Sequence, residues 1–205
     1  MSISLPTFID FTAGRPRLNT PMSVSRYGNR AISFMGNGDS YWTVDIETQP
    51  MDEDELARFE AWLARTRAGL ETIVYTPLHK GALPRAYWND PSNPAVADDG
   101  NLVSITNGKT ISINSLTNGL ELQEGDLVSL TTGDYHSLHR VLTGGVAAGN
   151  ALTLTVQPFI PSYIAAGAVF RCKDPRLNTR IVPSSIQVAD GQMPVARFQL
   201  MEVPR

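Results

Sequence analysis

The sequence predicts a mainly β fold with one α-helix: a β-sandwich or split-barrel domain that carries the helix and is interrupted by a small inserted β-barrel. Only the segment 52–68 has the hydrophobic period and the end signals of a helix. Short apolar runs separated by turn signals fill residues 102–172. The remaining segment, 173–205, is too short to fold alone, so we expect it to return to the first domain.

Composition excludes several classes of protein. The chain has 205 residues, with 17 Lys+Arg against 20 Asp+Glu, and a net charge of −3. This length fits one large domain or two small ones. A hydrophobic content of 42% at so low a net charge excludes a disordered chain. The single cysteine, Cys172, excludes a disulfide scaffold, and the lack of a basic excess argues against sequence-specific nucleic-acid binding.

Targeting signals are not apparent in the sequence. No stretch approaches the ~20 apolar residues of a membrane helix. The N-terminal run MSISLPTFIDF lacks the basic and long apolar regions of a signal peptide. We therefore expect a soluble protein that is made in a cytosol and does not insert into a membrane.

The segment before the helix is expected to form strands. Trp42, Val44 and Ile46 alternate with polar residues, which is typical of a half-buried strand. The glycine-rich run 36–39 is interpreted as a hairpin turn, because no helix follows it that could bind a phosphate. The expected strands are Ile3–Phe11, Ala31–Met35 and Tyr41–Thr48.

The helix is predicted from Asp52 to Ala68. Asp52 is a favourable N-cap, and Glu55 three residues later completes a capping box. The acidic run 52–55 suits the positive end of the helix dipole and lacks the alternating ligands of a calcium loop. Gly69 is placed to end the helix. The expected buried stripe, with Trp62 beside it, is Leu56, Phe59 and Leu63.

The segment after the helix divides at two breaks. Glu71–Tyr75 is an expected strand, and the run Trp88–Asn101, rich in Pro, Asp and Asn, is typical of a domain boundary. The short runs that follow predict a small closed or half-closed barrel. These runs are Leu102–Thr106, Thr110–Asn114, Leu127–Leu130, Leu138–Thr143, Ala151–Val156 and Ala168–Cys172.

A second break, at 173–175, leads to the returning strands. We expect a tight turn at Asp190-Gly191. Residues 1–85 and 173–205 would then form a discontinuous first domain, and residues 86–172 the inserted barrel. Assembly is expected to use the edges and faces of first-domain strands, including Ile3–Phe11, Tyr41–Thr48 and Val195–Val203. The expected returning strands are Thr179–Val182, Ile186–Ala189 and Val195–Val203.

Candidate chemical groups are few. His136 and His139 have HxxH spacing, but on a strand they point to opposite sides, which argues against a shared metal and favours solvent-facing or hydrogen-bonded histidines. Cys172 is interpreted as a buried structural thiol. The sequence contains no nucleophile elbow, HExxH helix or P-loop. We therefore expect no catalytic residue, no metal ligand and no cofactor.

One cluster suits a saccharide or a partner protein. Tyr135, His136, His139 and Arg140 combine aromatic and hydrogen-bonding groups and could line one face of the inserted barrel. The same residue types are common on any small barrel surface. Saccharide binding therefore remains an alternative rather than the leading interpretation.

The order of elements resembles that of the distal tail proteins of siphophages. In the first domain, the resemblance lies in Tyr41–Asp45 (YWTVD), in the end of the helix over 59–69, and in the strand 72–75. In the inserted segment it lies in the Gly-Asp-led strand 125–130, in His139-Arg140-Val141, and in the run 152–158 that ends in Pro158. The resemblance extends over nearly the whole chain and rests on order and length.

The resemblance implies a structural virion protein rather than an enzyme. Members of this family form a ring, typically a hexamer, that joins the tail tube to the baseplate hub at the tail tip. It implies location in the phage tail after synthesis in the bacterial cytoplasm, and an inserted barrel that is OB-like. Side fibre proteins or a host saccharide are implied as outer contacts. The alternative is a carbohydrate-binding or host-recognition module of a phage tail.

Overall fold

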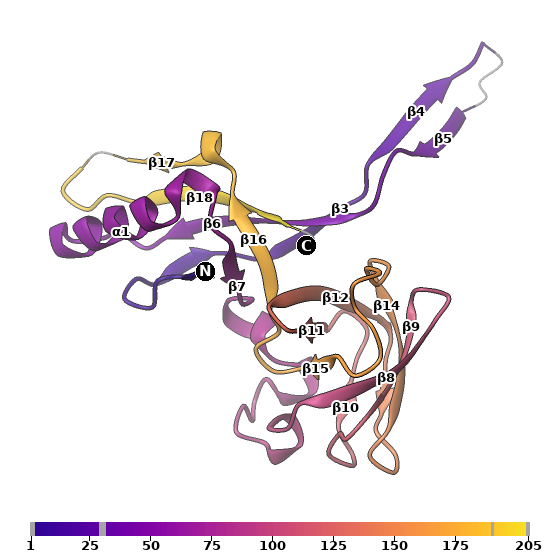
Figure 1. Cartoon of the computed structure of the whole chain (residues 1–205). Coiled ribbons are helices and arrows are strands. Elements are labelled where there is room, and N and C mark those ends of the chain that lie inside the picture. The colour runs from indigo at the N-terminus through magenta and orange to yellow at the C-terminus, as the bar shows by residue number, and fades with distance from the viewer. Residues whose placement is uncertain (1–2, 29–31, 190, 204–205) are drawn as a thin grey trace.

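The computed structural model describes residues 3–28, 32–189 and 191–203. It is mainly β, with one α-helix among these residues, a curled sheet, a closed barrel and a two-stranded arm that projects from the body (Figure 1). The predicted fold class is therefore confirmed. Ala31 in an expected strand and Asp190 in an expected turn lie outside the described residues.

The large sheet brings the two ends of the chain together. Its strands are β1 (Ile3–Ser4), β2 (Phe11–Ala13), β3 (Pro16–Asn19), β6 (Tyr41–Thr48), β7 (Ile73–Tyr75), β16 (Leu177–Ile181), β17 (Gln187–Val188) and β18 (Ala196–Glu202). The order is β1-β7-β16-β18-β6-β2, with β3 also on β6 and β17 also on β18. The strands that follow the barrel thus lie between strands that precede it.

The bounds and pairing of the sheet strands confirm some of the predicted strands and correct others. β6 has the predicted bounds, and Trp42, Val44 and Ile46 are all buried. The expected strand Ile3–Phe11 is wrong as one element, because the chain leaves the sheet after Ser4 and returns at Phe11. Pro6 in this gap has no N–H for a ladder hydrogen bond. β6 and β18 are paired on both sides, so they are not the open edges that we expected.

The helix α1 runs from Glu53 to Arg65 and begins as predicted. The Asp52 carboxylate accepts a hydrogen bond from the Glu55 N–H at 2.7 Å, and the Glu55 carboxylate accepts one from the Asp52 N–H at 3.0 Å. The helix ends earlier than predicted. Thr66 is the C-cap, and Arg67 and Ala68 have positive φ values, which an α-helix does not allow.

The buried stripe of α1 is narrower than predicted. Phe59 and Trp62 are buried and stack on each other with ring centroids 5.7 Å apart. Both also contact Phe198 of β18. Leu56 and Leu63, expected to be buried, are half-buried at the margins of this contact. The helix is therefore held against the sheet mainly through three aromatic rings.

Loss of the N-cap should weaken the fold measurably. We expect Asp52→Ala to lower the free energy of unfolding by about 1 kcal/mol, because the first turn loses its side-chain acceptor. Glu53→Ala removes a neighbouring charge that makes no capping bond and serves as the control. Urea unfolding of both variants measures the effect. Equal losses would mean that charge, rather than the cap, stabilises this end.

The barrel is closed by six antiparallel strands in the order β11-β12-β14-β9-β8-β15. Their bounds are β8 (Gly100–Thr106), β9 (Thr110–Asn114), β11 (Leu127–Thr132), β12 (Tyr135–Thr143), β14 (Leu152–Gln157) and β15 (Val169–Arg171). Each predicted run in this region overlaps one of them. A small ladder of β10 (Glu121–Leu122) with β13 (Gly145–Val146) lies outside the barrel path.

Short 3-10 turns connect these parts of the chain. They are η1 (Arg67–Gly69), η2 (His79–Ala82), η3 (Arg85–Tyr87), η4 (Pro94–Val96) and η5 (Pro183–Ser185). The chain enters and leaves the barrel region side by side, because the Asp174 N–H donates to the Ala82 carbonyl at 2.8 Å. All six barrel strands lie within the predicted insertion, 86–172.

The sheet and the barrel have separate hydrophobic cores that meet at one joint. Leu138 of β12 is buried in the core of the sheet rather than in that of the barrel. The indole N–H of Trp42 donates to the Leu138 carbonyl at 2.7 Å. The joint is therefore specified by a buried hydrogen bond as well as by apolar contact.

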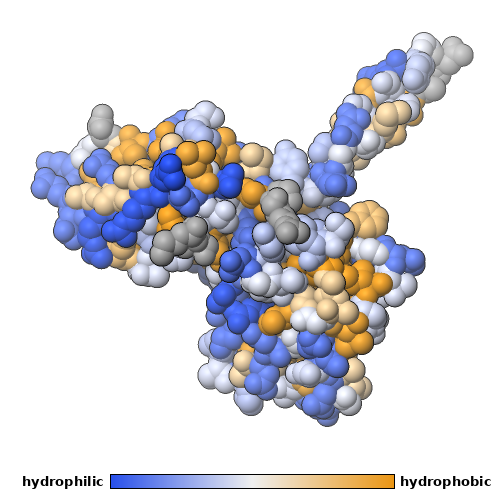
Figure 2. Space-filling model, viewed as in Figure 1, coloured by the Kyte–Doolittle hydropathy of each residue, from blue (hydrophilic) through white to orange (hydrophobic). Residues whose placement is uncertain are grey.

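The arm is a hairpin of β4 (Met22–Arg26) and β5 (Ile32–Gly36) that stands clear of the body (Figures 1 and 2). The glycine-rich run 36–39 lies at its base, where the Asn37 N–H donates to the Pro21 carbonyl at 3.0 Å. The predicted turn at 36–39 is therefore wrong as the tip of a hairpin. The β4–β5 connection lies between Arg26 and Ile32 instead.

Candidate functional site

The two strands of the arm have one apolar face and one polar face. Val24 pairs directly with Phe34, and Ser25 pairs with Ser33. Because side chains alternate along a strand, each cross-strand pair lies on one face and the next pair on the other. The apolar face carries Met22, Val24, Ile32 and Phe34 with Arg26, and the polar face carries Ser23, Ser25 and Ser33 with Met35.

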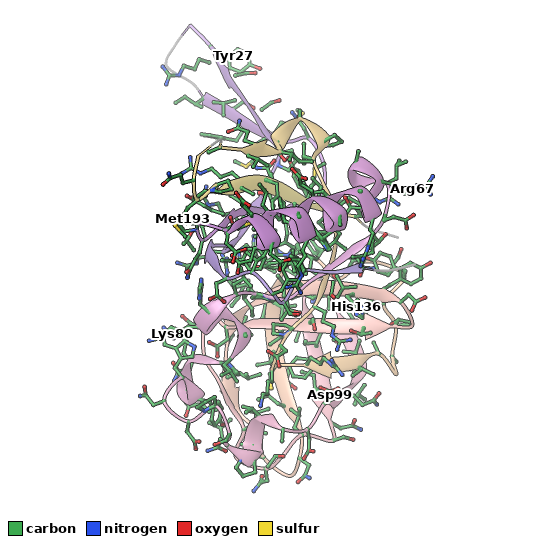
Figure 3. The ribbon with its side chains drawn as sticks, turned by 90° about the vertical axis from the view of Figure 1, so that its left-hand side faces the viewer. Tyr27, Arg67, Lys80, Asp99, His136 and Met193 are labelled. Carbon is green, nitrogen blue, oxygen red and sulfur yellow. The ribbon has the colours of Figure 1, made fainter. Side chains whose placement is uncertain are left out.

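The apolar face of the arm is open to solvent in the single chain. Every residue of β4 and β5 is exposed, with Val24 at 54% and Phe34 at 65%. Tyr27, 61% exposed, lies at the far end of the arm, away from the body (Figure 3). Alternation of this kind is typical of an antiparallel sheet with one covered face. None of the described residues covers this face.

The sheet also has an open edge beside the base of the arm. β2 and β3 follow each other along the same side of β6. Within the described residues, neither has a second partner strand. Their outward N–H and C=O groups are available to another chain. Of the arm, only β5 was predicted, as the strand Ala31–Met35; β4 and this edge were not found from the sequence.

The four residues proposed as saccharide contacts do not form one surface. The His136 ring nitrogen Nδ1 bonds the Thr131 hydroxyl at 2.9 Å, and this side chain is half-buried. Tyr135 contacts the ring of Tyr163, with centroids 5.7 Å apart. The guanidinium carbon of Arg140 lies 5.2 Å from the centre of the Trp42 ring, at the joint with the sheet.

His139 fits the hydrogen-bonded alternative, but at one ring nitrogen only. It is fully buried, so it is neither solvent-facing nor available to a saccharide. Its Nδ1 bonds the Pro158 carbonyl at 3.2 Å, whereas Nε2 has no hydrogen-bond partner among the described residues. Burial lowers the pKa of His139 to about 4. Of the four residues proposed to contact a saccharide, His139 is therefore not accessible to one.

Glu202 is a titratable group that sequence reasoning missed. It ends β18, and its carboxylate Oε2 accepts a hydrogen bond from the backbone N–H of Trp42 at 2.8 Å. Burial raises the pKa of Glu202 to about 7, and the hydrogen bond opposes this shift. In the sequence, Glu202 looks like an ordinary polar residue near the C-terminal end of the chain.

Cys172 is buried, as predicted. Burial raises the pKa of its thiol to about 12, so the reactive thiolate is scarce at neutral pH. We expect the folded protein to react with a thiol reagent at pH 8 at least a hundredfold more slowly than the unfolded protein in urea. Comparable rates in both states would show that the barrel opens readily at this point.

A comparison with models of protein families finds no match, and a comparison with curated proteins finds none. Among the described residues, no group of three or more His, Cys, Asp or Glu side chains is placed to hold a metal ion. No helix in the described part of the chain is long and apolar enough to span a membrane.

Proposed function

We propose that this chain is a structural, non-enzymatic virion protein of the siphophage distal tail type, whose copies form a ring between the tail tube and the tail-tip hub. The order of strands, helix and inserted barrel supports this assignment through the resemblance described above. The observation that carries the proposal is the exposed apolar face of the arm. A second copy of the chain is the partner that we assign to it.

A ring uses the same two surfaces on every subunit. In a cyclic assembly one surface of each copy binds a different surface of the next, and the contacts close on themselves. The arm and the open edge formed by β2 and β3 offer two such surfaces. A two-stranded hairpin has little stability of its own in water, so the arm gains stability when a neighbour covers it.

The resemblance supplies the details that the residues leave open. It suggests six copies around the tail axis, with the tail tube protein on one side and the baseplate hub protein on the other. Side fibre proteins or a host saccharide would contact the outside. These partners are part of the proposal, as is the location in the virion.

The mass of the purified chain tests the proposal. Light scattering from micromolar to millimolar concentration should reveal one closed species at a fixed multiple of the chain mass, and negative-stain images should show rings. A chain that stays monomeric over the whole range contradicts self-assembly through the arm. Filaments that grow without limit contradict a closed ring.

A further inference from the structure

A cleft of about 620 Å³ separates the edge of the sheet from the barrel. Its walls come from the connection between β2 and β3, from the η2–η3 segment and from the turn before β11. Lys80, which lines the cleft, is labelled at the left-hand side of the molecule in Figure 3. The cleft is open to solvent and large enough for more than a single small ion.

The cleft is more positive than the chain as a whole. Five Lys or Arg residues and three Asp or Glu residues line it, whereas the chain has a net charge of −3. Arg17 pairs with Asp45 at 3.4 Å, and Arg85 with Asp126 at 3.8 Å. Arg15 and Arg140 form no ion pair with a carboxylate of the described residues. Lys80 also has no carboxylate partner among these residues and lies 5.0 Å from the centre of the Trp88 ring, so three of the five positive charges in the cleft are left unpaired in the described part of the chain.

Arg15 and Arg140 line the cleft from different elements, the β2–β3 connection and β12. Arg140 lies on β12 with its guanidinium against the Trp42 ring. Arg15 follows Gly14, whose carbonyl accepts a hydrogen bond from the Tyr75 hydroxyl. A Cβ at Gly14 would overlap the Leu78 side chain, so this turn is closely packed. The backbone that carries Arg15 is therefore well fixed, while its side chain is exposed to solvent.

The two guanidinium groups in the cleft repel each other. Burial lowers the pKa of Arg140, and the charge of Arg15 lowers it further. An anion between the two groups would relieve this repulsion. Each guanidinium group also presents a planar set of N–H donors that matches the two oxygens of a carboxylate or phosphate.

We propose that Arg15 and Arg140 form an oxyanion-binding site that takes a carboxylate or phosphate group. The ligand bridges the sheet and the barrel, because Arg15 belongs to one and Arg140 to the other. The proposal rests on residues of one chain and not on ring assembly, although the β2–β3 edge that we assign to a neighbouring copy also lines part of the cleft. Its oxyanion comes either from free phosphate or from the carboxylates of an acidic peptide segment.

Calorimetric titration of the full chain tests the site with two probes, inorganic phosphate and an acetylated, amidated tetraglutamate peptide. Sodium chloride keeps the ionic strength constant, because screening alone changes the affinity for any anion. We expect saturable binding, and at least a tenfold loss of affinity in Arg15→Gln for the tighter probe. Arg180→Gln, which removes one exposed charge outside the cleft, should bind as the wild type does.

A second variant separates charge from geometry. Arg140→Lys keeps the positive charge but loses the planar donors, so we expect it also to weaken binding. Arg15 is exposed, so Arg15→Gln is expected to fold even if Arg140→Lys is unstable. Tighter binding of the peptide than of phosphate assigns the site to a protein segment, and the reverse assigns it to free phosphate. No saturable binding of either probe, or wild-type affinity in Arg15→Gln, overturns the proposal.

Discussion

Replacing Val24 and Phe34 together by Gln is expected to abolish ring assembly and to leave the fold of the single chain intact. Both side chains are exposed in the monomer, so their replacement removes no core contact. We therefore expect the free energy of unfolding of the monomer to change by less than about 0.5 kcal/mol. A loss of assembly without a loss of monomer stability is expected only if these two side chains form a contact between chains.

The expected loss of assembly follows from the apolar area involved. Covering a Val or a Phe side chain contributes about 1.5–3 kcal/mol each. The pair therefore contributes about 3–6 kcal/mol to every subunit contact, which is more than a hundredfold in the association constant. Light scattering at a concentration where the wild type forms rings should show monomers of the variant.

The neighbouring pair on the other face of the arm provides a matched control. Ser25→Gln with Ser33→Gln introduces the same two side chains one residue along each strand, at a directly paired position. This variant should assemble as the wild type does. Equal loss of assembly in both variants would mean that the arm tolerates no change, and normal assembly of the Val24 and Phe34 variant would exclude its apolar face as the contact.

A second large effect is expected from two titratable groups, the half-buried Glu202 and the fully buried His139. The pKa of Glu202 is raised to about 7 from its ordinary 4.5, so its contribution to stability falls as the pH rises from 4.5 to 7. The pKa of His139 is lowered to about 4 from 6.5, so stability falls as the pH drops from 6.5 to 4. Each effect is on the order of 3 kcal/mol.

The effects of Glu202 and His139 on stability oppose each other between pH 4.5 and 6.5. A variant that removes one group should therefore show the pH dependence that the other group causes. Glu202→Gln keeps an acceptor for the Trp42 N–H and should leave a protein that loses stability more steeply than wild type on acidification. His139→Asn keeps a donor near Pro158 and should leave one that loses stability more steeply as the pH rises.

Urea unfolding at pH 4.5, 5.5, 6.5 and 7.5 measures these slopes, and the comparison with wild type removes the contribution of all other carboxylates. The absolute stability of His139→Asn is not the readout, because a smaller side chain also leaves space in the barrel. If Glu202→Gln keeps the wild-type slope, Glu202 is ionised in the fold at little cost. The same outcome for His139→Asn would mean that the histidine reaches solvent.

Local patterns in the sequence predict much of the fold because they depend on neighbouring residues. The alternation in Tyr41–Thr48 follows from one covered face of a strand, and the capping box at Asp52 and Glu55 needs only four consecutive residues. Turn signals between apolar runs likewise marked every barrel strand. The end of the helix was misplaced, because the left-handed residues come at Arg67 and Ala68 rather than first at Gly69.

The candidate sites depend on contacts between distant parts of the chain, which local patterns do not reveal. Glu202 is half-buried because β18 places it beside Trp42, and His139 is fully buried because β12 turns that side chain inward. Arg15 and Arg140 meet only where the barrel lies against the sheet. The apolar face of the arm was missed because its alternating serines hide the pattern from a search for apolar runs.

Image reconstruction of an assembled tail that contains this chain tests the central claim most directly. We predict six copies of the fold around the tail axis, between the tube and the tip, with the Val24 and Phe34 face of each arm covered by the next copy. A single copy or three copies at this position, or arms that extend into solvent without touching a neighbour, would contradict the account.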